Sequence, residues 1–93
     1  MKYRELFQEG KKFFMKGLSA DPGIGERDMA NAALRFTEAI EEFEKQTPKG
    51  ILHKAIYAAP HLYRGFIYYQ VGKKKETIED LKKVIEAIEL SEP

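Results

Sequence analysis

Apolar residues along this chain recur at steps of three and four positions, which is the spacing of one face of an α-helix. The first run predicts a helix at about residues 2–18, and the second run extends from Met29 to Phe43. Between them, residues 19–28 are rich in glycine, proline and polar side chains, which predicts a loop. The segment Thr-Pro-Lys-Gly at 47–50 ends the second helix, because proline restricts the residue before it.

A third apolar run extends from Leu52 to Ile67 and passes through Pro60. Proline has no backbone N–H and crowds the preceding helical turn, so we expect the third helix to kink or restart at Pro60. A fourth run extends from Ile78 to Ile88, and no segment alternates with a period of two. The pattern therefore predicts an all-α fold of four antiparallel helices joined by short connections.

Parts of this pattern occur twice. Gly10 and Gly17 are seven positions apart, as are Gly65 and Gly72, and two aromatic residues stand three and four positions after the first glycine of each pair. The helices that follow also correspond, with Ala32, Phe36, Ala39 and Ile40 in the first copy matched by Thr77, Leu81, Val84 and Ile85 in the second. The offset is 55 for the glycines and 45 for these later positions, because the first copy has the longer loop.

The double pattern of Gly-x2-aromatic-x3-Gly followed by small-x3-large-x2-small resembles the tetratricopeptide repeat (TPR), a helical hairpin of about 34 residues. The resemblance implies a single domain of two stacked TPR-like hairpins over residues 1–93. Its parts are a first repeat at about 3–46 with a long loop at 19–28, a linker at 47–58 and a second repeat at about 59–93. Stacking is also expected because one hairpin of this size cannot bury both its apolar faces. The alternative is an ordinary four-helix bundle with coincidental glycine pairs.

Composition excludes several classes of protein. Sixteen Lys and Arg residues against fifteen Asp and Glu residues give a net charge of +1, which provides no overall attraction to nucleic acid or anionic lipid. The chain has no cysteine, which excludes a disulfide, a thiol nucleophile and a thiolate metal site. No stretch approaches the roughly 20 apolar residues that span a bilayer, and the first residues lack a secretory apolar core. We therefore expect a cytoplasmic protein.

The charges are sorted by helix. Residues 1–20 hold five bases and two acids, and residues 47–75 hold six bases and no acid. Residues 21–46 hold three bases and seven acids, and residues 76–93 hold two bases and six acids. The first helix of each hairpin is therefore basic and the second is acidic. One interpretation is mutual attraction between packed helices, and the other is a basic binding surface.

The TPR resemblance favours the binding surface, since in that family the first helices of the hairpins line a concave, peptide-binding face. Carried over residue by residue, this face consists of Arg4, Phe7, Lys11, Phe14, Met15, Leu62, Phe66, Tyr69 and Gln70. A basic and aromatic face suits an acidic peptide or protein segment with apolar anchors. We do not expect it to clamp a C-terminal carboxylate, because Phe7, Leu62 and Phe66 stand where that clamp needs polar residues.

The fourth helix and the start of the third carry more apolar residues than one neighbouring helix can cover. We therefore expect a homodimer. The candidate interface residues are Leu52, Ile56, Ile78, Ile85 and Ile88. The alternative is that the segment before Pro60 folds back and caps the stack.

No group of residues indicates catalysis. His53 and His61 are eight positions apart, which places them about 80° apart around a helix axis, and no carboxylate lies between residues 47 and 75. We therefore expect no metal site and no cofactor. Serine, histidine and acidic residues form no recognisable nucleophile, so we expect a protein without enzymatic activity.

Three functions remain open. The first is a protein–protein interaction module that binds an acidic, apolar-anchored segment. The second is a self-assembling structural subunit without a ligand in its groove. The third is a nucleic-acid-binding helical protein, in which Lys73–Lys75 and Arg64 would have to form one basic patch.

Overall fold

The computed structural model describes residues 2–20, 25–45 and 51–91, and the side chains of these residues except 51–55 and 90–91. Four helices account for nearly all of them: α1 (Lys2–Ser19), α2 (Gly25–Glu44), α3 (Ile51–Gln70) and α4 (Lys74–Ser91). The described residues contain no strand. The all-α fold predicted from the hydrophobic spacing is therefore confirmed.

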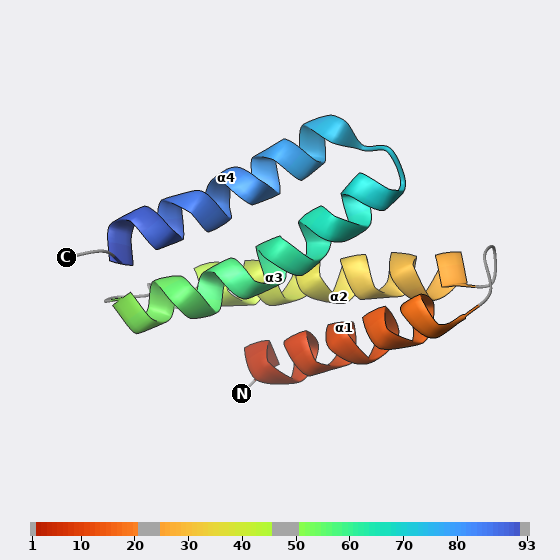
Figure 1. Ribbon diagram of the computed structural model, residues 1–93. Coiled ribbons are helices and arrows are strands. Elements are labelled where there is room, and N and C mark those ends of the chain that lie inside the picture. Colours follow the sequence, from red (N-terminus) through yellow and green to blue (C-terminus); the bar gives the residue numbers. More distant parts are fainter. Residues whose placement is uncertain (1, 21–24, 46–50, 92–93) are drawn as a thin grey trace.

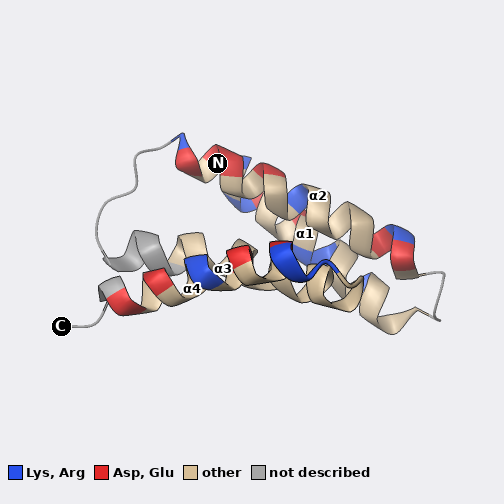
Figure 2. Cartoon of the chain, turned by 90° about the horizontal axis from the view of Figure 1, so that it is seen from above, with Lys and Arg blue, Asp and Glu red and all other residues tan. Residues whose placement is uncertain are grey.

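The helices pair as two antiparallel hairpins. α1 packs against α2 and α3 packs against α4, and the two hairpins meet mainly through α2 and α3 (Figure 1). Seen from above, the same two pairs lie side by side (Figure 2). The molecule is consequently a flattened body of 43 × 29 × 18 Å rather than a closed four-helix bundle.

A glycine stands at a close contact between the two helices of each hairpin. A Cβ atom on Gly10 would lie 2.7 Å from the ring of Phe36, and one on Gly65 would lie 3.2 Å from Cβ of Asp80. Only glycine therefore permits the observed spacing at Gly10, and the position is tight at Gly65. Gly10 and Gly65, which the sequence repeat aligns, both allow the two helices of their hairpin to approach closely.

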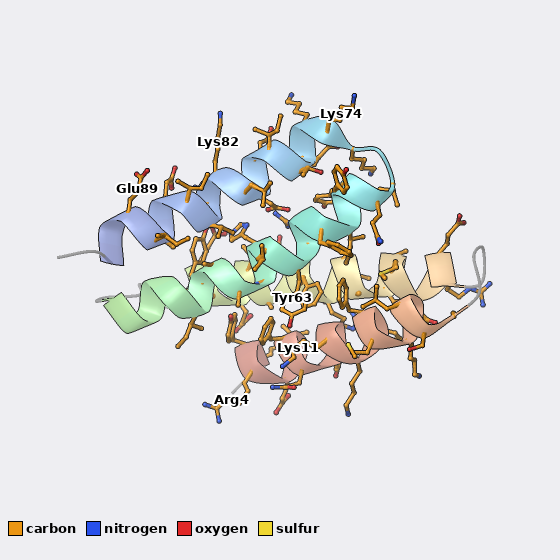
Figure 3. All side chains as sticks on the ribbon, viewed as in Figure 1. Arg4, Lys11, Tyr63, Lys74, Lys82 and Glu89 are labelled. Atoms are coloured by element: carbon orange, nitrogen blue, oxygen red, sulfur yellow. The ribbon has the colours of Figure 1, made fainter. Side chains whose placement is uncertain are left out.

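Aromatic rings fill the core between the hairpins. Tyr63 of α3 lies between α3 and α1 (Figure 3), with its ring centroid 5.1 Å from Phe14, 5.2 Å from Phe36 and 5.8 Å from Phe7. Phe36 is fully buried. Tyr63 thus joins helices of both hairpins in one hydrophobic cluster, since ring pairs at these separations attract each other beyond their burial.

α3 continues through Pro60 without a break, so the expected restart is absent, but its second half rises more steeply than its first in Figure 1. The proline cannot donate to the carbonyl of Ile56, four residues earlier. The hydroxyl of Tyr3 on α1 donates to that carbonyl instead, at 2.8 Å. The bend in α3 is therefore stabilised from the other hairpin.

Candidate protein-binding surface

Large apolar side chains are exposed where α1 and α3 lie next to each other. They are Met15 and Leu18 on α1 and Leu62, Phe66 and Tyr69 on α3, with exposed fractions from 42% to 72%. Steps of three and four positions put each set on one side of its helix. The ring of Phe66 meets that of Phe14, the neighbour of Met15, at 5.6 Å. This contact brings Phe66 of α3 against α1, and the two exposed sets on either side of it are together named the α1–α3 face.

The nine predicted binding residues differ in their exposure: two are covered by neighbouring rings and seven lie at the surface. Phe14 is only 9% exposed, and its ring packs against Tyr63 and Phe66 in the core. Phe7 is half-buried and contacts Phe36. The expectation that these two rings are exposed is therefore wrong, because the bent α3 covers them. The remaining members of the set are Arg4, Met15, Leu62, Phe66, Tyr69 and Gln70, all exposed, and Lys11, half-buried.

The α1–α3 face is basic. α3 contributes no acidic residue to it, since none occurs from 51 to 70. On α1, Glu9 turns to the other side of the helix, where its carboxylate lies 3.0 Å from Nε of Arg35 on α2. Lys11 stays at the face, with Nζ 5.5 Å from the centroid of the Phe7 ring. Cations therefore border the apolar residues of this face.

A surface hollow of about 750 Å³ extends this basic character along α1. Its lining includes Lys11, Lys12, Lys16 and Arg35 as well as Glu9, and Arg35 is ion-paired with Glu9 and Glu38, so the three lysines carry the basic character. Met15 borders both the hollow and the α1–α3 face. A second hollow, of about 490 Å³, lies between α2 and the end of α3, where Leu34 and Val71 are exposed.

A buried charged cluster, which was not anticipated from the sequence, joins α2, α3 and α4. Arg64 donates to both carboxylate oxygens of Asp80, from Nε at 2.9 Å and from Nη2 at 2.6 Å. Its Nη1 donates to the hydroxyl of Thr37 at 3.0 Å. Nδ1 of His61 lies 2.7 Å from Asp80, whose side chain is 2% exposed. Nε2 of His61 is buried and has no hydrogen-bond partner among the described residues.

The cluster fixes the ionised state of Asp80. Burial alone would raise the pKa of this carboxyl, but hydrogen bonds from His61 and Arg64 and the nearby guanidinium charge hold the pKa below its ordinary value. Burial acts to lower the pKa of Arg64, and the Asp80 hydrogen bond and charge raise it instead. Arg64 is thus committed to an internal ion pair, which does not favour the patch with Lys73–Lys75 that nucleic-acid binding requires.

α4 carries two stripes, and the larger apolar one is about half exposed, with Leu81 at its inner edge, where Cδ2 lies 3.8 Å from the position of a Cβ on Gly65 of α3. The stripe packed on α3 consists of small or polar residues, namely Thr77, Asp80, Val84 and Ala87. The other stripe, here named the α4 stripe, consists of Ile78, Leu81, Ile85 and Ile88, each between 39% and 54% exposed. Three of the predicted interface residues belong to it. Of the other two, Ile56 is 37% exposed and the side chain of Leu52 lies outside the described residues.

A signal for the buried cluster was present in the sequence. Asp80 lies between Thr77 and Val84 at steps of three and four, which is the spacing of a buried stripe. An acid at such a position needs a buried cation. Arg64, which directly precedes Gly65 in the sequence, is the partner that the structure provides.

The described residues contain no group of three or more His, Asp or Glu side chains that could hold a metal ion. Within the same residues, no helix has the length and apolarity needed to cross a bilayer. Comparisons with protein-family models, with curated proteins and with solved structures found no match to this chain.

Proposed function

We propose that this protein is a non-enzymatic protein–protein interaction module. Its α1–α3 face binds a peptide or protein segment that carries acidic residues and apolar anchors. The observation that carries the proposal is the exposure of Met15, Leu62, Phe66 and Tyr69, at 42% to 72%, on a surface to which α3 adds no acid. Contiguous apolar groups rimmed by polar residues are typical of interaction sites.

The aromatic rings and the cations of this face contribute to binding in different ways. Phe66 and Tyr69 offer large areas at low conformational cost, which is what binding hot spots require. Arg4 and Lys11 attract an acidic segment and orient it, and they contribute more to the association rate than to the final affinity. The arrangement also agrees with the TPR resemblance, because the first helices of both hairpins share this face. We place the site of action in the cytoplasm.

The test uses two matched synthetic probes: an acidic amphipathic peptide with leucine and tryptophan anchors, and the same peptide with every glutamate replaced by lysine. NMR chemical shifts of the protein should respond at Met15, Phe66 and Tyr69 to the acidic probe only. Phe66→Ala and Lys11→Glu should each weaken binding about tenfold.

Leu34→Ala is the matched control, because Leu34 is also exposed but lies in the hollow beside α2. This variant should bind the acidic probe like the wild type. Equal binding of both probes, or binding that Phe66→Ala leaves unchanged, would contradict the proposed function.

A further inference from the structure

The α4 stripe occupies positions that are covered in the other hairpin. Applying the offset of 45 residues, Leu81, Ile85 and Ile88 correspond to Phe36, Ile40 and Phe43 of α2. Those three α2 residues are between 0% and 5% exposed, whereas their α4 counterparts are between 39% and 53% exposed. The same face of the repeat is therefore buried once and exposed once.

Helices on both sides cover this face in the first hairpin: on α1, the ring of Phe7 lies 5.8 Å from Phe36 and the ring of Tyr3 lies 5.0 Å from Phe43. The ring of Tyr63 on α3 stacks on Phe36 at 5.2 Å, and the ring of Tyr57 on α3 stacks on Phe43 at 5.5 Å. A helix is thus the kind of element that this face of the repeat accepts. The α4 stripe is therefore expected to be covered by a helix as well.

The spacing of the stripe identifies a helix of its own kind. Ile78, Leu81, Ile85 and Ile88 follow steps of three, four and three, which is the seam of a two-helix coiled coil. Ile78 and Ile85 take the first apolar position of each heptad. Such a seam is complementary to itself, so one copy of α4 fits another.

The charges of α4 set the direction of that pairing. Lys74 and Lys75 stand in its first turn beside Glu76, and Glu86 and Glu89 stand towards its end. Lys74 and Glu89 lie at opposite ends of the helix in Figure 3. A helix dipole favours the opposite distribution. α3 has no acid that could compensate the lysines. Both halves of α4 are mixed in charge, so the complementarity lies in individual side chains: an antiparallel copy can bring the first-turn lysines of one helix to Glu86 and Glu89 of the other.

Single residues show the same complementarity. Lys75 and Glu89 lie seven positions before and after Lys82, on the flank of the seam that faces away from α3. All three are exposed, and among the described residues Lys75 and Glu89 make no ion pair within the chain. A two-fold axis at Lys82 therefore places Lys75 of each protomer opposite Glu89 of its partner. On this axis Lys82 lies opposite its own copy, and its long stem lets the two ammonium groups separate in solvent.

We propose that the α4 stripe is the contact of an antiparallel homodimer, in which α4 of one protomer packs against α4 of its partner. The dimer uses a different surface from the α1–α3 face. It therefore stands or falls independently of the proposed function.

The first test measures mass by sedimentation equilibrium. The wild type should be a dimer at micromolar concentration, and Ile85→Glu should weaken the dimer about 100-fold, because it buries a charge in the seam. Leu34→Glu, an equally drastic change at an exposed residue of α2, should leave the dimer unchanged. A monomeric wild type overturns the inference, as does an Ile85→Glu variant that dimerises normally.

A charge exchange tests the pairing without touching the apolar seam. Glu89→Lys should weaken the dimer about tenfold, and adding Lys75→Glu to the same chain should restore it. Both side chains are exposed, so neither change threatens the fold of the protomer. Failure of the second change to restore the dimer contradicts the antiparallel pairing.

Spin labels measure the direction directly, because the chain has no cysteine of its own. Labels on Lys82→Cys should lie close together across the two-fold axis. Labels on Lys75→Cys should be separated along the axis by a further ~21 Å, from seven residues on each side at about 1.5 Å each. Equal distances for the two variants indicate parallel helices and overturn the proposal. A monomer that still binds the acidic probe would refute the dimer and leave the proposed function standing.

Discussion

At the scale of single residues, Tyr3 replaces a backbone hydrogen bond that Pro60 cannot make. Pro60 leaves the carbonyl of Ile56 without its usual helical donor, and the hydroxyl of Tyr3 takes that place at 2.8 Å. The burial that makes this possible also raises the pKa of Tyr3 to about 12. The bond connects residues 53 positions apart, so it stabilises the contact between the hairpins as well as the bend.

The Tyr3 bond predicts a specific double-mutant result. Tyr3→Phe should lower the free energy of unfolding by about 1 kcal/mol, since it leaves a part-buried carbonyl without its donor. In a Pro60→Ala background the same change should cost much less, because the alanine supplies the backbone N–H that proline lacks. Urea unfolding of the four proteins measures the coupling. Equal costs in both backgrounds would show that Tyr3 acts through packing alone.

Asp80 predicts a sensitivity to acid. Its pKa is lowered in the folded state, so its contribution to stability is fully present above the ordinary value of about 3.9. That contribution is lost as the pH falls through this value towards the lower folded-state pKa. Asp80→Asn should cost about 3 kcal/mol at pH 7, because Arg64 keeps a buried charge without its partner.

Urea unfolding at pH 7 and pH 3 checks this prediction. The stability of Asp80→Asn should change less between the two pH values than that of the wild type. Glu79→Gln is the control, since Glu79 is exposed on the same helix and should behave like the wild type. An unchanged pH dependence in Asp80→Asn would show that the ionised Asp80 does not contribute to the pH dependence of stability.

At the scale of the elements, the contact between α1 and α2 depends on the missing side chain at Gly10. Gly10→Ala should destabilise the protein by about 1–3 kcal/mol, although alanine favours a helix, because the new Cβ meets the fully buried Phe36 ring. Gly72 provides the comparison. Its φ of +83° favours glycine, but a Cβ there meets nothing within 4 Å, so Gly72→Ala should cost about 1 kcal/mol.

Thermal unfolding followed by circular dichroism ranks the two glycine variants. The larger loss at Gly10 distinguishes a packing role from a conformational one. A Gly10→Ala variant as stable as the wild type would mean that the hairpin adjusts its helix separation freely.

The elements also show what sequence patterns can and cannot predict here. Hydrophobic spacing predicted all four helices, because each carries an apolar stripe at helical steps, although the stripe of α4 that led to the prediction is the exposed one. It could not say which stripe of α4 faces inward, since Ile78 and Ile85 outrank Thr77 and Asp80 in hydrophobicity. Packing decides the matter: Asp80 finds Arg64 and His61 on α3, while the isoleucines remain exposed.

At the scale of the whole molecule, the two hairpins are held together chiefly by aromatic rings. Tyr63→Ala removes contacts with Phe7, Phe14 and Phe36 at once and should cost about 3–4 kcal/mol. Phe66→Ala should cost much less, because Phe66 is 42% exposed. Chemical denaturation of the two variants makes the comparison, and equal losses would place Phe66 in the core rather than at the surface.

The binding set was predicted only in part for a related reason. Helical spacing placed Phe14 on the same side of α1 as Met15, which is correct, but the depth of each residue depends on how closely α3 approaches. Tyr63 and Phe66 cover Phe14, whereas nothing described covers Met15. The hydrophobic pattern of α1 alone does not determine how closely α3 approaches it.

The cover that α3 provides has a consequence for synthesis. α1 and α2 are synthesised before α3, so Phe36 and Phe43, which rings of α1 already contact, lack the further cover of Tyr63 and Tyr57 until those residues have emerged from the ribosome. During that interval the nascent first hairpin exposes apolar surface and is prone to aggregate. Slowing translation within the third helix should therefore reduce the yield of folded protein, and slowing it within the fourth should not.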